Sequence, residues 1–383
     1  MGKFISGTIS FLIAMVLQTG CGNPETEGGG KEIIYAGTFS EEGLIVLEFN
    51  RAERSFTEIQ RISDIEAPNF QALHPAGGFL YSVSSQGVSE DDNYGSVAAY
   101  RIDPETGKLT FLNIRSAEGR GPCHISIDPD GRFAYVSNYS SGNISVYPIR
   151  EDGSLGEAVD VVQHEGSSVH SRQGGPHMHS IIPSEDGRFI YASDLGIDKV
   201  KIYEVDRQSG VLSPAETPYV ENVAGSGPRH FTIHPNGDYA YSVEELSSTV
   251  AVFSVDRQTG ALEQRQRINM LPDDFDGNNS AADIHISPDG RFLYATNRGH
   301  DSLAIYSIDE TSGELTFVNR EHTRGGHPRN FAIDQRGDFL FAANRDDDNI
   351  VLFERNRDTG ELMYTGSEAV VPRVVCVTQL FLD

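Results

Sequence analysis

The sequence predicts an all-β chain folded as a seven-bladed β-propeller of four-stranded antiparallel blades. The first observation is a Gly-x-Leu turn that recurs six times, at intervals of 46 to 57 residues. The second is a glycine turn of the type DPDG or HPNG that recurs in step with it. Repeats of about 40 to 50 residues with four strands each are typical of propeller blades.

Each Gly-x-Leu turn follows a β-type run that ends in charged residues, such as SVAAYRIDPETGKL. Glycine takes a positive φ without steric cost, so each turn is expected to close a hairpin. Between the two turns residues alternate with period two, as half-buried strands do. The first series is Gly107, Gly153, Gly210, Gly260, Gly313 and Gly360; the second is Gly78, Gly131, Gly187, Gly237, Gly290 and Gly337.

The repeats also give the number of blades. Residues 32–62 supply three strands but lack the first, innermost strand of a blade, and Val374–Leu380 has the length and pattern of the missing one. We therefore expect seven blades, the first closed by the C-terminal strand, which leaves the ring without an open edge. The six full repeats begin near Pro68, Gly121, Pro176, Gly227, Ala281 and His327.

Residues 1–21 are predicted to be a signal peptide of the lipoprotein type. Lys3 precedes an apolar core that is too short to span a bilayer comfortably, and small residues precede Cys21. Gln18 is atypical three residues before the cysteine, so a plain export signal or an uncleaved anchor is the alternative. We expect an exported protein of the periplasm or cell envelope, with a lipid on Cys21 as its one link to a membrane.

After the signal peptide, residues 22–31 have the Gly-rich, charged composition of a flexible linker, and residues 32–383 are assigned to the propeller. Cys123 and Cys376 fall on non-adjacent blades, so neither a disulfide nor a cysteine metal site is expected.

The formal net charge of −26 argues against a nucleic-acid partner, because neutralising phosphates needs a basic face. A monomer is expected. Acidic residues gather in turns, which favours a solvated surface; calcium is the alternative, although no run has the spacing of a known calcium loop. The three runs are Glu90–Asp92, Asp273–Asp276 and Asp346–Asp348.

One mouth of the channel is predicted to carry two columns of polar residues, because the start of each innermost strand lies beside the end of the next strand. A polar ring at a channel mouth favours a ligand site there. The alternative is that these side chains bond neighbouring blades and fix the ring. The first column is Gln71, His124, His179, His230, Asp283 and Asn330; the second is Ser85, Asn138, Asp194, Glu244, Asn297 and Asn344.

Two segments depart from simple repetition, namely PHMHS, with His177 and His179, and GPRHF, which is followed by EEL. Arg229 and Glu245 lie across one hairpin, which brings them to the same mouth as His179 of the preceding blade. A histidine, an arginine and a glutamate in one cleft are the parts of an acid/base site with an oxyanion partner. A metal on His177 and His179 is an alternative without a third ligand, and no cofactor is expected.

In GPHMHSIIPSEDGRFIYASD, SGPRHFTIHPNGDYAYSVEEL and HPRNFAIDQRGDFLFAANR the chain resembles the seven-bladed propeller lactonases. That family is typified by the propeller-type 6-phosphogluconolactonase and is related to fungal carboxymuconate cyclases. The resemblance extends from about residue 32 to the end and implies that His179, Arg229 and Glu245 lie in the active site. Glu244 stands where the family has asparagine, so the local charge differs.

The sequence therefore predicts an enzyme that hydrolyses a sugar lactone. His179 is expected to act as general base or proton donor, Arg229 to stabilise the oxyanion, and Glu245 to orient one of them. Export favours an unphosphorylated aldonolactone over a phosphorylated one. Further substrate contacts are expected from His124, His177, His230, Asn297, Arg298, His327, Arg329 and Asn344.

Two other functions compete with hydrolysis. A cycloisomerase acting on a muconate-type dicarboxylic acid would use the same His179, Arg229 and Glu245 without water. A non-enzymatic envelope propeller for binding or scaffolding would need none of them, because the fold by itself implies no activity.

Overall fold

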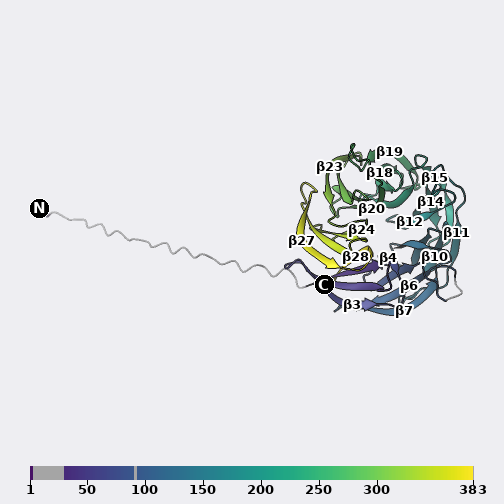
Figure 1. Cartoon of the computed structure of the whole chain (residues 1–383), viewed down its shortest axis with the longest axis horizontal. Helices are drawn as coiled ribbons and strands as arrows, with labels where there is room; N and C mark the ends of the chain where they lie inside the picture. Colours follow the sequence, from purple (N-terminus) through teal and green to yellow (C-terminus); the bar gives the residue numbers. More distant parts are fainter. Residues whose placement is uncertain (3–29, 90–92, 383) are drawn as a thin grey trace.

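A computed structural model describes residues 1–2, 30–89 and 93–382. The described residues form seven four-stranded antiparallel sheets arranged in a ring (Figure 1), which confirms the predicted propeller. The predicted signal peptide from residue 3 on, the linker as far as residue 29 and the acidic run Glu90–Asp92 lie outside the described residues. In the described part of the chain, no helix is long and apolar enough to cross a membrane.

Blade 1 consists of β28, β1, β2 and β3, and blades 2 to 7 follow as β4–β7, β8–β11, β12–β15, β16–β19, β20–β23 and β24–β27. The innermost strands are β28 (Val374–Leu382), β4 (Pro68–Leu73), β8 (Pro122–Ile127), β12 (Met178–Pro183), β16 (Pro228–Ile233), β20 (Ser280–Ile286) and β24 (Pro328–Ile333). The second strands are β1 (Lys31–Thr38), β5 (Phe79–Ser84), β9 (Phe133–Asn138), β13 (Phe189–Asp194), β17 (Tyr239–Glu244), β21 (Phe292–Arg298) and β25 (Phe339–Asn344).

The two outer positions complete each blade. The third strands are β2 (Leu44–Asn50), β6 (Ser96–Ile102), β10 (Asn143–Pro148), β14 (Lys199–Val205), β18 (Thr249–Val255), β22 (Ser302–Ile308) and β26 (Asn349–Arg355). The outermost strands are β3 (Ser55–Ile62), β7 (Leu109–Ser116), β11 (Asp160–Gln163), β15 (Leu212–Glu221), β19 (Leu262–Asn269), β23 (Leu315–His322) and β27 (Leu362–Val370).

Burial follows the position of a strand in its blade. The second strands β9 (FAYVSN) and β25 (FLFAAN) are buried along their whole length, whereas the outermost β3 has several exposed residues. A second strand is covered on both faces because a blade packs between two others. The seven hydrophobic clusters each take residues from two adjacent blades, so the core lies between blades.

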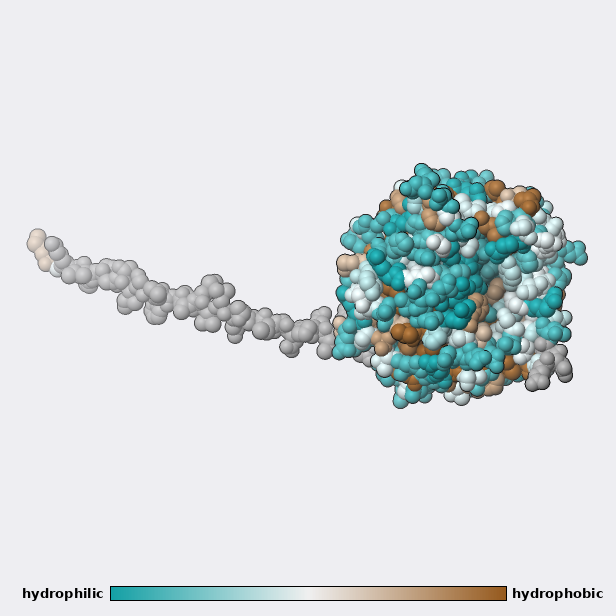
Figure 2. Space-filling view, in the orientation of Figure 1, coloured by the Kyte–Doolittle hydropathy of each residue, from teal (hydrophilic) through white to brown (hydrophobic). Residues whose placement is uncertain are grey.

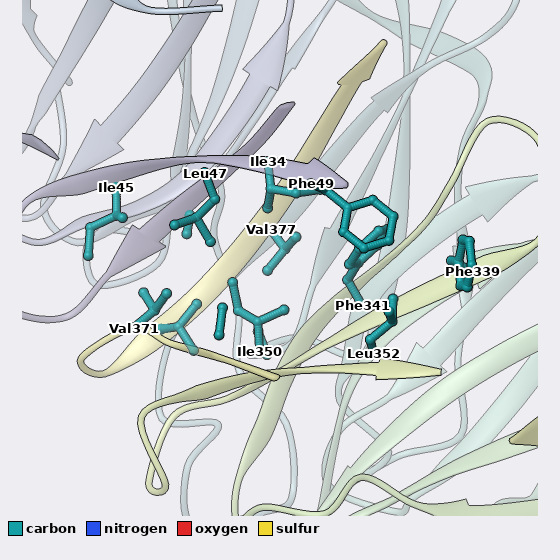
Figure 3. Packing of buried hydrophobic residues seen from close by; sticks show 14 residues of the cluster. Ile34, Ile45, Leu47, Phe49, Phe339, Phe341, Ile350, Leu352, Val371 and Val377 are labelled. Carbon is teal, nitrogen blue, oxygen red and sulfur yellow. The ribbon is translucent and has the colours of Figure 1, made fainter. Parts of the chain in front are cut away.

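The ring closes where the predicted C-terminal strand joins blade 1. β28 pairs with β1 from Leu382 opposite Lys31 to Val374 opposite Thr38. Figure 3 shows the cluster that seals blade 1 against blade 7, where the Phe49 and Phe341 rings meet edge to face at 5.1 Å. A buried Phe contributes about 2–3 kcal/mol, so this seam is held by burial as well as by strand pairing.

The glycines of the Gly-x-Leu turns serve two purposes. All six have positive φ, as predicted. The Gly107 carbonyl also accepts a hydrogen bond of 2.8 Å from the Tyr35 hydroxyl of the preceding blade, and Tyr81 reaches Gly153 in the same way. A Cβ on Gly107 would lie 2.5 Å from Ile33, so the glycine permits both the turn and the close packing of blades.

One glycine of the second series is corrected. Gly77, not Gly78, has the positive φ of 75° and donates its backbone N–H to the His74 carbonyl. The pair Gly77–Gly78 made the turn position ambiguous in the sequence. On the outside of the propeller, Figure 2 shows hydrophilic residues over most of the visible face, with hydrophobic residues in small separate groups.

Candidate active site

A β-bulge lies at the start of each innermost strand of blades 2 to 7. In blade 5, Pro228 pairs with Glu244 and His230 with Val243, so Arg229 is an extra residue without a partner. A bulge bends the strand and changes the direction of a side chain. The extra residues in blades 2, 3, 4, 5 and 7 are Asn69, Cys123, His179, Arg229 and Arg329.

These bulges revise the predicted columns. In blade 4, Ser180 pairs with Ser193 and therefore occupies the regular position that was predicted for His179. His179 is instead the bulge residue of this blade. In blade 2, Phe70 rather than Gln71 corresponds to His124, and Ser84 rather than Ser85 ends the second strand. One extra residue per strand shifts the alternation, and the sequence gives no sign of it.

A cavity of about 300 Å³ opens where the bulges meet. Four bulge residues, one of which is Arg329, line it together with Glu245, from the loop after β17, and two further arginines. Its lining residues are Phe39, Asn69, Ser85, Gly121, Pro122, Cys123, Tyr139, Ser140, Arg172, His179, Glu245, Arg298 and Arg329.

Glu245 is the centre of an arginine cluster. Its Oε1 lies 2.6 Å from Arg172, and its Oε2 lies 2.9 Å from Arg229 Nε and 3.0 Å from Arg298. Arg229 is 1 % exposed and does not line the cavity; it also donates to the Ala282 carbonyl. The predicted contact of Arg229 with Glu245 is present, but Arg229 lies behind the carboxylate rather than facing a substrate.

The cluster carries a surplus of positive charge, because Arg172, Arg229, Arg298 and Arg329 face a single carboxylate. Burial alone would raise the pKa of Glu245, but Arg298, Arg229 and Arg172 prevail and lower it. Burial and the neighbouring guanidinium groups lower the pKa of Arg229 to about 9 and that of Arg329 to about 10. Glu245, Arg229 and Arg329 are therefore charged at neutral pH, and the excess of guanidinium groups makes the cavity attractive to anions.

Arg329 is the cavity arginine whose donors are all free of partners among the described residues. Its guanidinium lies over the Phe39 ring at 5.0 Å, and no hydrogen bond or ion pair reaches it from residues 30–89 or 93–382. Five N–H donors held by a ring contact suit a carboxylate, a phosphate or a developing oxyanion.

His179 is 3 % exposed and lines the cavity. Its Nδ1 lies 3.8 Å from Cys123 Sγ, while Nε2 has no hydrogen-bond partner among the described residues. Burial, followed by Arg229, His230 and Arg329, holds the pKa of His179 well below its usual 6.5. The imidazole is therefore neutral at neutral pH, which is the form that accepts a proton.

Cys123 does not supply a nucleophile. Burial raises the pKa of its thiol to about 12, so it stays protonated at neutral pH. Sγ lies 3.5 Å from the Met178 and His179 carbonyl oxygens, either of which can accept the thiol proton.

Arg172 lines the cavity but was not predicted from the sequence as a site residue. It lies in the long connection between β11 and β12, which has 14 residues where four other blade connections have five or six. Gln173 is fully buried and anchors this connection through bonds to Leu195 and Asp198. Arg172 thereby reaches Glu245 and the Tyr139 hydroxyl. The unusual length of this connection was the one feature of the sequence that could have indicated a role for it at the site.

Four predicted contact residues lie near the cavity without lining it. His177 stacks on Tyr139 at 4.5 Å and bonds its backbone carbonyl, so it supports the wall. His124 and His230 point into the channel, their ring centres 5.5 Å apart. His327 lines an adjoining groove that shares Arg298 with the cavity.

Asn297 and Asn344 point away from the cavity. Both are fully buried, and the Asn344 amide donates to the Thr323 carbonyl, in the connection that arrives from the preceding blade. Asn138 bonds Ala117 in the same way in blade 3. These contacts match the alternative in which this column joins the blades.

The described residues contain no group of three His, Cys, Asp or Glu side chains placed to hold a metal ion. Cys123 and Cys376 are both free and buried, on β8 and β28. Fold and site together define a propeller with a cavity at one mouth that is lined by a buried imidazole, a carboxylate and three guanidinium groups.

Comparison with known proteins places this architecture in a family. A family model described as "Lactonase, 7-bladed beta-propeller" matches residues 33–379. A 6-phosphogluconolactonase of Bacillus subtilis is 38% identical over 307 residues, which cover 79% of this chain and 85% of the relative. One of Formosa agariphila is 36% identical over 309 residues, covering 79% and 86%.

Among solved structures, the periplasmic gluconolactonase of Pseudomonas aeruginosa has a TM-score of 0.86 and 34% identity, covering 92% of this chain and 99% of that chain. The chain belongs to the seven-bladed β-propeller lactonase family. It is an enzyme, a lactonase of the carboxylic ester hydrolase class, as the sequence predicted.

Proposed function

We propose that the chain hydrolyses a sugar lactone in the arginine-lined cavity. One observation carries the proposal: a neutral, buried imidazole, that of His179, lines the same 300 Å³ space as three guanidinium groups. The volume suits one sugar ring at the low end of ligand sites. A base beside positive charge meets both needs of ester hydrolysis, namely proton removal from water and stabilisation of an oxyanion.

In the proposed reaction His179 takes a proton from water as the water oxygen bonds to the lactone carbonyl carbon. The carbonyl oxygen becomes an oxyanion, which Arg329 and Arg298 stabilise. The ring C–O bond then breaks, and the imidazolium returns its proton to the departing ring oxygen. The products are a free hydroxyl and a carboxylic acid, which loses its proton at neutral pH.

The proposed roles of Arg229 and Glu245 differ from those that the sequence led us to expect. Because Arg229 lies behind Glu245 and does not line the cavity, we assign the contact with the oxyanion to Arg329, whose donors are free. Glu245 is paired with three arginines and has a lowered pKa, so it is a poor base. Its proposed role is to hold Arg172 and Arg298 in place at the rim of the cavity.

The excess of guanidinium groups supports a lactone that carries an anionic group. The Bacillus and Formosa relatives are named for a phosphorylated substrate, whereas the Pseudomonas structure is named a gluconolactonase and periplasmic. Export with a lipid on Cys21 favours instead the neutral, unphosphorylated aldonolactone, so the test compares both lactones. Mass measurement of the mature protein tests cleavage and lipidation, and Cys21→Ser should abolish the lipid.

The test is turnover by the purified full-length chain. Glucono-1,5-lactone and its 6-phosphate are supplied at equal concentration, and the acid released is followed at constant pH. Hydrolysis above the spontaneous rate is expected for at least one lactone, with loss in His179→Ala. A phosphate preference should disappear in Arg329→Gln if Arg329 binds the phosphate rather than the oxyanion.

Absence of turnover on every lactone would overturn the proposal. Conversion of a muconate-type dicarboxylic acid without water uptake would instead assign the site to the cycloisomerase. Equal hydrolysis by His179→Ala and the parent chain would remove His179 from the mechanism and leave the cavity as a binding site.

A further inference from the structure

A second space, of about 750 Å³, lies between blades 4 and 5. Its lining comes from the turn between β12 and β13, the turn between β16 and β17, and the segment where β18 ends. The arginine-lined cavity takes its residues from the opposite ends of the inner strands, so the two spaces lie on different faces of the ring. We call the second space the inter-blade pocket, and the reaction proposed above makes no use of it.

In two other pairs of adjacent blades, a histidine bridges the corresponding gap. His74 begins the turn after β4, and its Nε2–H donates to the Gly131 carbonyl of blade 3 at 3.0 Å. His234 begins the turn after β16 and donates in the same way to Gly290 of blade 6 at 2.9 Å. In each ring Nδ1 accepts a backbone N–H, which leaves the proton on Nε2. The imidazole thus fills the space between the blades and satisfies a glycine carbonyl.

Blade 4 has a serine at this position. The Ser184 N–H donates to the Phe189 carbonyl, just as the N–H groups of the two histidines donate to the first residue of their second strands. The Ser184 hydroxyl bonds Asp186 at 2.8 Å instead of reaching blade 5. The Gly237 carbonyl, which corresponds to the two glycine carbonyls above, accepts no hydrogen bond from the described residues. The inter-blade pocket is therefore the space that an imidazole fills elsewhere in the ring.

Between blades 6 and 7 the gap is filled from the third strand. Arg355 is 4 % exposed and donates from Nη1 to the Gly337 carbonyl at 2.7 Å and from Nε to the Tyr294 hydroxyl at 2.9 Å. Val255 ends the third strand of blade 5 as Arg355 ends that of blade 7, and its side chain has no donor. Blade 5 therefore supplies no guanidinium group at the place where blade 7 does.

Tyr191 adds an unpartnered hydroxyl to the pocket wall. It is 1 % exposed and lines the pocket, but its hydroxyl has no hydrogen-bond partner in residues 30–89 and 93–382. Stacking on Phe231, with ring centres 5.2 Å apart, holds its ring in place. Four of the other five equivalent tyrosines instead donate to a Gly-x-Leu glycine of the following blade. The four bonded pairs are Tyr35 with Gly107, Tyr81 with Gly153, Tyr241 with Gly313 and Tyr294 with Gly360.

The charged groups around the pocket favour a cation. Glu185 and Asp186 both line it; Asp186 pairs with Arg188, whereas Glu185 has no ion pair in the described part of the chain. Arg257 also lines the pocket, but its Nη2 is held by Asp238 at 2.9 Å. The chain as a whole carries a formal net charge of −26. Together these charges raise the local concentration of positively charged ligands.

We propose that the inter-blade pocket binds a planar organic cation, namely an amidinium or guanidinium group carried on an apolar ring. The N–H groups of the cation donate to the Gly237 carbonyl and the Tyr191 hydroxyl. The apolar ring packs on Phe189, Ile233 and Val255, which line the pocket. The ligand thereby takes the place that an imidazole or guanidinium group of the chain itself takes between other blades.

The test is a calorimetric titration of the full-length chain with para-bromobenzamidinium at pH 7, in the absence of any lactone. The unaltered chain should bind it at one saturable site. Ser184→His restores the residue that fills this space in blades 2 and 5. It should weaken binding about tenfold or more, whereas Ser184→Ala, which leaves the space open, should weaken it by less than about threefold. Equal binding by Ser184→His and the unaltered chain, or no saturable binding by the unaltered chain, would overturn the proposal.

An anion of the same shape separates charge from packing. Para-bromobenzoate carries the same ring and bromine, and the carboxylates of the pocket should exclude it. Binding of the benzoate as tight as that of the amidinium, and weakened equally by Ser184→His, would mean that the pocket selects an apolar ring and not a cation, which would overturn the proposal.

Crystals of the unaltered chain with para-bromobenzamidinium give a test that does not depend on a variant folding. Anomalous scattering from bromine should locate the ligand between blades 4 and 5, and bromine found only elsewhere would overturn the proposal. Because none of these measurements uses a lactone, their failure would leave the proposed hydrolysis untouched.

Discussion

Two columns of polar residues lie on adjacent strands at one mouth of this propeller, and their side chains have different roles. The bulge residues Asn69, Cys123, His179 and Arg329 line the cavity. The residues that end the second strands turn the other way and bond the connection arriving from the preceding blade. Their contacts run from Ser84 to Glu66, Asn138 to Ala117, Asp194 to His164, Glu244 to Asn222 and Asn344 to Thr323.

The comparison shows that polarity at a channel mouth does not by itself define a site. Both columns are polar and both are buried, but only the bulge turns its side chain out of the regular alternation. The regular column joins the blades, and the irregular one lines the cavity in which we propose the reaction takes place. Four variants and two pH dependences test this contrast, from the largest expected effect to the smallest.

His179→Ala should lower kcat about 10³-fold, which is a typical contribution of a general base. Its neighbour Ser180→Ala is the control, because Ser180 occupies the regular position and should change kcat by less than about twofold. The two variants are compared by initial rates at saturating lactone. A similar loss in both would show that the bulge does not separate catalytic from regular positions.

Glu245→Gln should lower the free energy of unfolding by about 3 kcal/mol, because it leaves buried guanidinium groups without their carboxylate. The exposed pair of Glu58 and Arg61 is the control, and Glu58→Gln should cost less than about 1 kcal/mol. Urea unfolding at pH 7 measures both. Comparable stability of the two variants would mean that Glu245 does not hold the cluster.

The same pair gives a pH dependence of stability. The folded-state pKa of Glu245 is lowered, so its contribution is present above the ordinary glutamate pKa of 4.5 and is lost as the pH falls below that value. Acid unfolding below pH 4.5 should therefore be shallower in Glu245→Gln than in the parent chain. Parallel acid transitions would contradict this assignment.

Arg329→Gln should reduce kcat/KM about 100-fold, the usual cost of losing one oxyanion donor. Arg324→Gln is the control, since Arg324 is exposed and pairs with Glu321. Steady-state kinetics on one lactone distinguish them. An Arg329 variant that keeps full kcat/KM would move the oxyanion contact to another residue.

Asn344→Ala should lower the free energy of unfolding by about 1–2 kcal/mol, because the buried Thr323 carbonyl loses its donor. The kcat of the folded protein should stay within about twofold. Thermal unfolding and active-site titration test this together. Loss of turnover without loss of stability would place Asn344 in the site after all.

The smallest effect is on the pH profile. The pKa of His179 is held well below 6.5 and its neutral form is the base, so kcat/KM should stay constant as the pH falls through 6.5 and decline only in more acid solution. Initial rates between pH 4 and 8 measure this. A limb centred near 6.5 would indicate an ordinary, solvated histidine.

Much of the site could be predicted from the chain. His179 and Glu245 stood out because PHMHS and EEL break the repeat, and the structure brings both to one cavity. Arg172 could not be found in that way, because it belongs to no repeat and meets Glu245 only through the fold. Asn297 and Asn344 were indistinguishable from site residues by type, since direction and not polarity separates them.

The sequence by itself determined the number of blades, their order and the closure of the ring by β28. These follow from local turn chemistry and from a period of two, which neighbouring residues impose on one another. Tertiary structure alone decided which polar residue of each hairpin faces the cavity and which arginines gather around Glu245. One bulged residue reverses the direction of every later side chain in a strand, and packing of adjacent blades sets where the bulge falls.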